Sequence, residues 1–112
     1  MDFDAARKKA EAGLRELQEK NEVGKLKLAK LVAYIREHLA EGYELKEAGG
    51  ATYKVIRIVA SVNEESVYFG YNPSLDTPGS AGAYFIAPTY VQKYEAMAEN
   101  LLGYLQLRKA LR

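Results

Sequence analysis

The spacing of apolar residues changes twice along the chain, and this change limits the fold more strongly than any other feature. Up to about residue 41, apolar side chains recur every three or four residues, which predicts helix. From Tyr43 to residue 87 they alternate with polar residues, as in β-strands. Helical spacing returns over residues 88–111. We therefore predict an α+β fold in one domain, residues 1–112, with the element order ααββββα.

The N-terminal region, residues 1–41, carries two apolar stripes of different character. The first is narrow and rich in alanine, and it consists of Phe3, Ala6, Ala10, Leu14 and Leu17. The second is wide, and it consists of Leu28, Leu31, Val32, Ile35 and Leu39. Asn21 and Gly24 interrupt the pattern, so we expect a helical hairpin or, less favoured, one kinked helix. Because the first stripe buries little surface, we expect the first helix to lie outside the fold or against a partner chain.

Residues 43–87 predict a four-stranded antiparallel sheet. Gly49-Gly50 is expected to form a two-residue hairpin loop, since both positions tolerate positive φ. Asn63-Glu64-Glu65 predicts the next turn, and residues 72–82 predict a long loop with several turn residues. A long C-terminal helix is expected over residues 88–111, opened by proline and threonine. The four strands would begin at Tyr43 and then span residues 51–62, 66–71 and 83–87.

The composition excludes several kinds of site. Without cysteine, the chain cannot form disulfides or thiolate metal sites. Its single histidine, His38, cannot build the usual metal sites alone, and we expect it on the surface in the last turn of a helix. The sequence contains neither a Walker loop nor a GxSxG motif. We therefore expect a protein that is not an enzyme and needs no cofactor or metal.

Hydropathy and charge limit the location and the partners. No apolar run approaches the roughly 18 residues of a membrane span. The N-terminus is acidic and lacks the apolar core of a signal peptide. We therefore expect a cytoplasmic protein with no membrane partner. The 16 basic and 15 acidic side chains nearly balance, so no segment has the charge excess typical of nucleic-acid binding.

Nine tyrosines without a tryptophan are the unusual feature of the composition. Tyrosine packs like an apolar residue but keeps a polar tip, so it is enriched at binding surfaces. We therefore predict a small interaction protein that binds another protein, or itself as a homo-oligomer, as accessory or virus-encoded factors do. The alternative is that the sheet tyrosines fill the core. The predicted binding residues are those around the long loop: Tyr68, Tyr71, Asp76, Ser80 and Tyr84.

Two other functions remain open from the sequence. A nucleic-acid-binding protein would use the lysines at the start of the second helix, Lys25, Lys27 and Lys30, together with the sheet tyrosines. Arg7, Lys8 and Lys9 would lie nearby if the helices formed a hairpin. A small-molecule-binding domain, natural or designed, would have a pocket between the sheet and the C-terminal helix, lined by Tyr68, Tyr84, Tyr94 and Met97.

From Glu22 onward, the expected order of one helix, three strands and one helix is similar in topology to double-stranded-RNA-binding domains. Those domains carry a lysine cluster at the opening of the last helix. In this chain the corresponding stretch is Pro88-Thr89-Tyr90-Val91-Gln92-Lys93, with a single lysine. The resemblance therefore concerns the order of elements and implies nothing about function.

Overall fold

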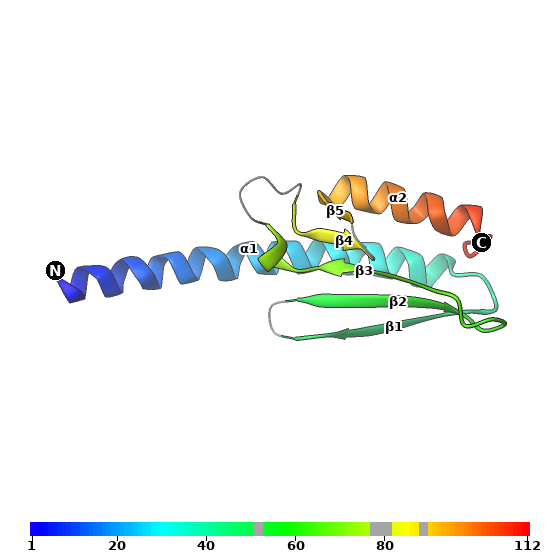
Figure 1. The fold of residues 1–112 in the computed structure, drawn as a ribbon, viewed down its shortest axis with the longest axis horizontal. Coiled ribbons are helices and arrows are strands. Elements are labelled where there is room, and N and C mark those ends of the chain that lie inside the picture. Colours follow the sequence, from blue (N-terminus) through cyan, green and yellow to red (C-terminus); the bar gives the residue numbers. More distant parts are fainter. Residues whose placement is uncertain (51–52, 77–81, 88–89) are drawn as a thin grey trace.

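The computed structural model describes residues 1–50, 53–76, 82–87 and 90–112, of which residues 90 and 91 are described by their backbone. Two helices and an antiparallel sheet form the fold (Figure 1). The α+β class and the C-terminal helix are confirmed. The chain order is α1, β1, β2, β3, a short 3₁₀ turn η1, β4, β5 and α2.

The N-terminal region forms one continuous helix, α1, Phe3–His38, so the prediction of two helices is wrong. Asp2 caps it by accepting hydrogen bonds from the backbone N–H groups of residues 4 and 5. Asn21 and Gly24, at which a break was predicted, instead lie within the helix and contact Tyr71 of the sheet. The Tyr71 hydroxyl donates to Asn21 Oδ1 at 3.0 Å, and a side chain on Gly24 would overlap the Tyr71 ring.

Gly24 gives the first test of this packing. A Cβ placed there would lie 2.5 Å from Tyr71 Cε2, and that ring is buried and hydrogen-bonded. We expect Gly24→Ala to destabilise the fold by about 1–3 kcal/mol through overpacking, despite the better helix propensity of alanine. Gly103→Ala in α2 meets nothing within 4 Å and is the control; it should stabilise the protein by about 0.5–1 kcal/mol. Urea unfolding of both variants measures the difference, and equal effects would contradict the packing described.

The sheet contains the four expected strands and one that was not expected. β1 (Tyr43–Gly49), β2 (Lys54–Ala60), β3 (Ser66–Tyr71), β4 (Tyr84–Ile86) and β5 (Tyr90–Gln92) are antiparallel neighbours in that order. β5 was predicted to be the start of the last helix. That helix, α2, spans only Tyr94–Leu107, so the predicted boundary at residue 88 is wrong. Tyr90–Gln92 instead pairs with β4.

The connections agree only in part with the expected hairpins. Gly49 pairs with Lys54, so it belongs to β1 and not to the first turn as predicted, and residues 51 and 52 lie outside the described residues. Gly50 N–H donates to the Tyr53 carbonyl across the connection between β1 and β2. The turn predicted around Asn63 is present between β2 and β3, with Glu64 at φ 58°. Of the predicted loop 72–82, the described part includes η1, Pro73–Leu75.

Both helices pack on the same face of the sheet, which forms a single core. Alternate residues of the central strands point into it, and Phe69 and Ile56 are among the most buried side chains. The helices contribute Leu28, Leu31, Val32 and Ile35 from α1 and Met97, Leu101 and Leu105 from α2. The residues that follow α2 contact the residues that follow α1: Ala40 N–H donates to the Ala110 carbonyl at 2.7 Å.

Only the C-terminal half of α1 belongs to this core. The molecule extends 61 Å along its longest axis and 24 Å and 20 Å along the others. The N-terminal half of α1 projects beyond the strands (Figure 1), and residues 1–20 are all exposed. We call the rest of the molecule the body. The fold therefore presents a bare helix beside a packed α+β body.

Candidate functional site

The most unusual surface is the apolar stripe on the projecting half of α1, called here the N-terminal stripe. It consists of Phe3, Ala6, Ala10, Leu14 and Leu17. Phe3 is 77% exposed, Leu14 56% and Leu17 48%. The stripe continues the spacing of the buried face of the same helix, since Leu17 is followed seven residues later by Gly24 and then by Leu31. A core-like face thus runs past the end of the body without a cover from the described part of the chain.

An uncovered helix of this kind is marginal in water. Most helix stability in proteins comes from tertiary packing of an apolar face, and isolated helices of this length are only partly formed. Local ion pairs add little: Arg7 Nε lies 3.3 Å from Glu11 Oε1, and such exposed i,i+4 pairs contribute about 0.3–0.5 kcal/mol. The last exposed turn contacts the body through Lys20 Nζ and Asp76 Oδ2, 2.8 Å apart. Burial of the N-terminal stripe by a partner would supply the missing stabilisation.

A second candidate surface is a pocket of about 350 Å³ where α1, β3, β4 and α2 meet. Three tyrosine rings contact one another in sequence beside it: Tyr71 and Tyr84 are tilted with centroids 5.1 Å apart, and Tyr84 and Tyr94 meet edge to face with centroids 5.4 Å apart. The Tyr84 hydroxyl donates to the Gly24 carbonyl at 2.9 Å. Lys27 Nζ lies 5.8 Å from the centre of the Tyr94 ring. The hydrogen bonds of Tyr71 and Tyr84 both lead back to α1, so these two rings anchor the helix to the sheet.

Burial changes the ionisation of these groups. It raises the pKa of Tyr71, Tyr84 and Tyr94 because the phenolate would be poorly solvated. The pKa of Tyr84 rises to about 12, with smaller contributions from Tyr71, Tyr94 and Glu95. The hydrogen bond to Asp76, and then its charge, raise the pKa of Lys20. The pocket therefore keeps its tyrosines protonated beyond the range in which free tyrosine ionises.

This predicts alkaline destabilisation that can be followed by tyrosinate absorbance. Below about pH 10, the ordinary pKa of tyrosine, these side chains are protonated in both the folded and the unfolded state, and their ionisation does not lower the free energy of unfolding. Between about pH 10 and 12 the unfolded state loses protons first, so stability falls as pH rises. With nine tyrosines and no tryptophan, the titration should show a late component that Tyr84→Phe reduces. A single transition near pH 10 with the fold intact would contradict the burial of these rings.

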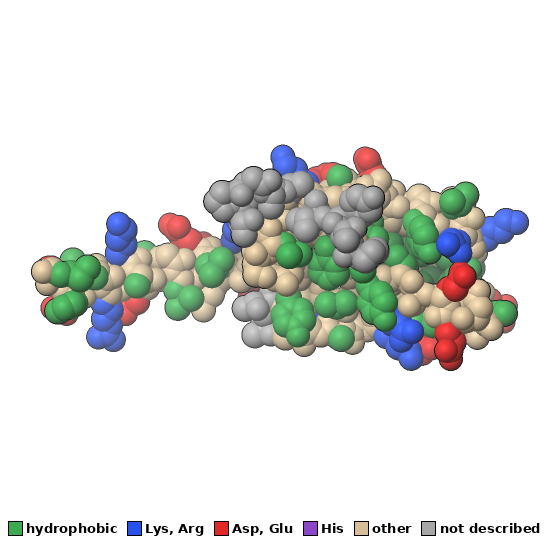
Figure 2. Space-filling model, viewed as in Figure 1, with side chains coloured by type: hydrophobic (Ala, Val, Ile, Leu, Met, Phe, Trp, Pro, Cys, Tyr) green, Lys and Arg blue, Asp and Glu red, His purple; other side chains and the backbone are tan. Residues whose placement is uncertain are grey.

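A third surface is the face of the sheet turned away from both helices. Figure 2 shows hydrophobic side chains gathered over it. Tyr68 is 39% exposed, and the Arg57 guanidinium lies 5.7 Å from the centre of its ring. Phe85 crosses Gly70 on the neighbouring strand, where a Cβ would lie 2.9 Å from the Phe85 Cζ atom. This face combines aromatic, aliphatic and basic side chains, as protein-binding surfaces do.

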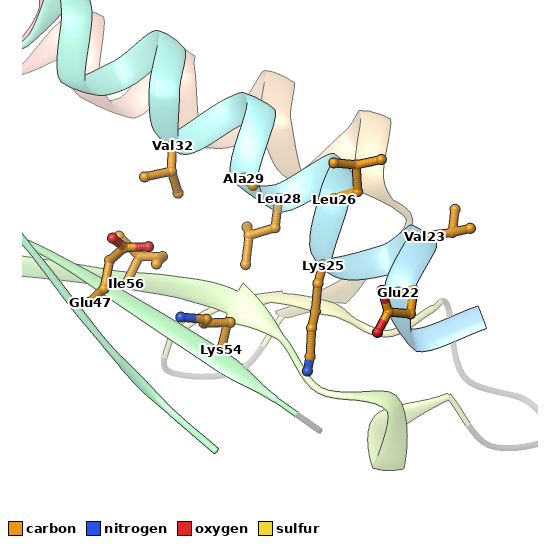
Figure 3. A pocket seen from close by; sticks show the side chains of 10 residues that line it. All are labelled: Glu22, Val23, Lys25, Leu26, Leu28, Ala29, Val32, Glu47, Lys54 and Ile56. Atoms are coloured by element: carbon orange, nitrogen blue, oxygen red, sulfur yellow. The ribbon is translucent and has the colours of Figure 1, made fainter. Parts of the chain in front are cut away.

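A fourth surface is a groove of about 420 Å³ between α1 and the first two strands. Figure 3 shows Leu28 and Val32 pointing from α1 toward β2, where Ile56 lies, while Val23 points away. Charged side chains surround the groove: Glu22, Lys25, Glu47 and Lys54. Its apolar lining combines the core residues Leu28, Val32 and Ile56 with the exposed residues Val23, Leu26 and Ala29, and it opens beside the edge strand β1.

The predicted binding residues do not form one surface. Tyr71 and Tyr84 are 2% and 7% exposed and belong to the core cluster, whereas Tyr68 lies on the opposite face of the sheet. Asp76 pairs with Lys20 at the mouth of the tyrosine pocket. Ser80 lies outside the described residues. Of the residues expected to line a pocket next to α2, Tyr84 and Tyr94 line this pocket and Met97 is fully buried, while Tyr68 lines a different hollow beside Asn100 and Tyr104 of α2.

The predicted lysines are also dispersed. Lys25 lines the groove shown in Figure 3, Lys27 faces the tyrosine pocket, and Lys30 is exposed on α1. Since α1 is one helix, Arg7–Lys9 lie several turns away, so the expected cluster is not formed. His38, the last residue of α1, stacks on Tyr34 with ring centroids 4.2 Å apart. His38 lies in the last turn of α1, as expected, but it is partly buried rather than fully on the surface.

Comparison with protein-family models, curated proteins and solved structures gave no match for this chain. Within the described ranges, no group of three His, Cys, Asp or Glu side chains could hold a metal ion. Neither described helix combines the length and apolar character needed to cross a membrane. The N-terminal stripe was visible in the sequence as a narrow apolar face, but only the structure shows that the body leaves it bare.

Proposed function

We propose that the protein is a non-catalytic interaction protein that binds a protein partner through the N-terminal stripe on α1. The observation that carries this proposal is the exposure of Phe3, Leu14 and Leu17 on a helix whose same face is buried one heptad further on. Apolar side chains aligned at heptad spacing pack into a complementary apolar surface, most simply another helix. The charges around the stripe nearly balance, which suits a protein surface better than a phosphate backbone or an anionic membrane.

The position of the stripe supports this function further. It lies outside the body, so a partner can cover it without rearranging the core. The partner would at the same time stabilise residues 3–17 of α1, which are all exposed in the part of the chain that the structure describes.

Photo-crosslinking in the cells that naturally make the protein tests this proposal. A photoreactive amino acid at position 14, on the stripe, is expected to give a discrete protein adduct. The same group at position 12 is the matched control, since Ala12 is also exposed but faces the opposite side of α1. Adducts of equal yield at both positions, or none at position 14, would contradict a binding role for the stripe.

A further inference from the structure

We propose that the partner of the N-terminal stripe is a second copy of this chain, with the two projecting helices antiparallel and crossing at Ala10. This deepens the proposed function and rests on it. Three features of the described residues lead to this occupant: the length of the bare segment, the order of its large and small residues, and the face of α1 that the body covers.

The body limits how any helix can lie on the stripe. From Asn21 onward, Tyr71 occupies the same face of α1, with its hydroxyl on Asn21 and its ring against Gly24. A second helix on the stripe must therefore stop before residue 21. In a parallel pair both helices would continue past this level, and the two bodies would compete for the same space. In an antiparallel pair each body lies at its own end.

The length of the bare segment fits such a pair. The stripe runs from Phe3 to Leu17 and its midpoint is Ala10. An antiparallel copy centred there brings its own Phe3 beside Leu17. Because α1 begins at Phe3, capped by Asp2, the helix of the second copy ends just before the body of the first. The uncovered segment thus has the length required to cover its own copy.

The sizes of the side chains also match under this two-fold symmetry. Leu14 of one copy faces Ala6 of the other, and Ala10 meets Ala10 at the centre. Small residues at the crossing let the two backbones approach closely, while Phe3 and Leu17 together close each end. A parallel pair in register would place leucine against leucine and alanine against alanine, which leaves the alanine layers poorly filled.

Charge does not oppose the pairing. The projecting segment carries nearly balanced charge: Arg7, Lys8, Lys9, Arg15 and Lys20 against Asp4, Glu11, Glu16 and Glu19. In the centred antiparallel pair, Arg7 of one copy lies within two residues of the level of Glu11 of the other, on the same flank. Lys9 and Glu11 are the charged residues nearest the centre, each beside its own copy, and their long side chains can extend into solvent. The interface is small, so we expect a dimer that dissociates on dilution.

Cysteine scanning tests both the partner and its direction, because the natural chain has no cysteine. In the full-length purified protein, Ala10→Cys should form a disulfide dimer under mild oxidation, since the two thiols meet at the crossing. In Leu17→Cys the two residues are 14 helix positions apart, about 21 Å, and cannot be joined. Ala12→Cys, on the opposite face, measures collision. Paired thiols have a local concentration in the millimolar range. At about 50 µM protein we therefore expect Ala10→Cys to form disulfide dimers at least about tenfold faster than Ala12→Cys.

Each other outcome overturns the inference. Equal rates of disulfide formation for Ala10→Cys and Ala12→Cys would mean that the thiols meet only by random collision and that the N-terminal stripes do not pair. Rapid crosslinking of both Ala10→Cys and Leu17→Cys would mean a parallel pair. All three positions are exposed, so circular dichroism should show an unchanged fold in each variant. If crosslinking fails here while position 14 captures a different protein in cells, the second copy is excluded and the proposed function survives.

Discussion

Replacing Phe69 with alanine is expected to lower the free energy of unfolding by about 3–5 kcal/mol. Phe69 is fully buried in the core between the sheet and both helices. Removing its ring leaves a cavity that Ile56, its partner on β2, cannot fill, since that side chain is itself held in the packed core. Since small domains are stable by only about 5–15 kcal/mol, this single change should move the urea midpoint strongly.

Phe85→Ala is the matched control for that substitution. Phe85 lies on the adjacent strand and on the opposite face of the sheet, where it is only partly buried. We expect a loss of about 1–2 kcal/mol, in proportion to the smaller area that the ring removes from water. Equal losses for the two variants would mean that the face around Phe85 is also a core, and that the sheet is covered on both sides.

Leu28→Ala is expected to cost about 2–5 kcal/mol, whereas Leu14→Ala should change the stability of the body by no more than about 0.5 kcal/mol. The two leucines lie two heptads apart on one face of the same helix, but Leu28 is 2% exposed and Leu14 is 56% exposed. Urea unfolding at low protein concentration, where a dimer would be dissociated, measures both. A large loss for Leu14→Ala under these conditions would mean that the N-terminal half of α1 packs on its own body.

The helical part of the fold was only partly predictable from the sequence. The apolar spacing correctly predicted the buried stripe Leu28, Leu31, Val32 and Ile35, but the same spacing in the N-terminal stripe lies on an exposed face. The predicted break at Asn21 and Gly24 was wrong. We expected it because a polar residue and a glycine within a helical pattern usually mark the end of a helix. Here they serve a long-range contact: the Tyr71 hydroxyl needs an acceptor, and its ring needs a position without a side chain. Sequence spacing carries no record of a partner 50 residues away.

The sheet illustrates the same limit. Alternation in residues 43–71 predicted the first three strands, but β5 is only three residues long and has no pattern of its own. Its conformation comes from pairing with β4. The candidate site was limited in the same way, because long-range packing decides which tyrosines are buried. The sequence could not decide which tyrosines were exposed, since both faces of β2 looked apolar, and the structure assigns Tyr71 and Tyr84 to the core and Tyr68 to the surface.

The central claim is that α1 is divided near Asn21 into a half that holds the fold together and a half that is free to bind. Amide hydrogen exchange along α1 tests it most directly, because exchange reports local opening segment by segment. In dilute purified protein, residues 3–17 should exchange rapidly and residues 28–35 slowly, and raising the protein concentration should protect the first segment alone. Equal, concentration-independent protection along the whole helix would contradict this division.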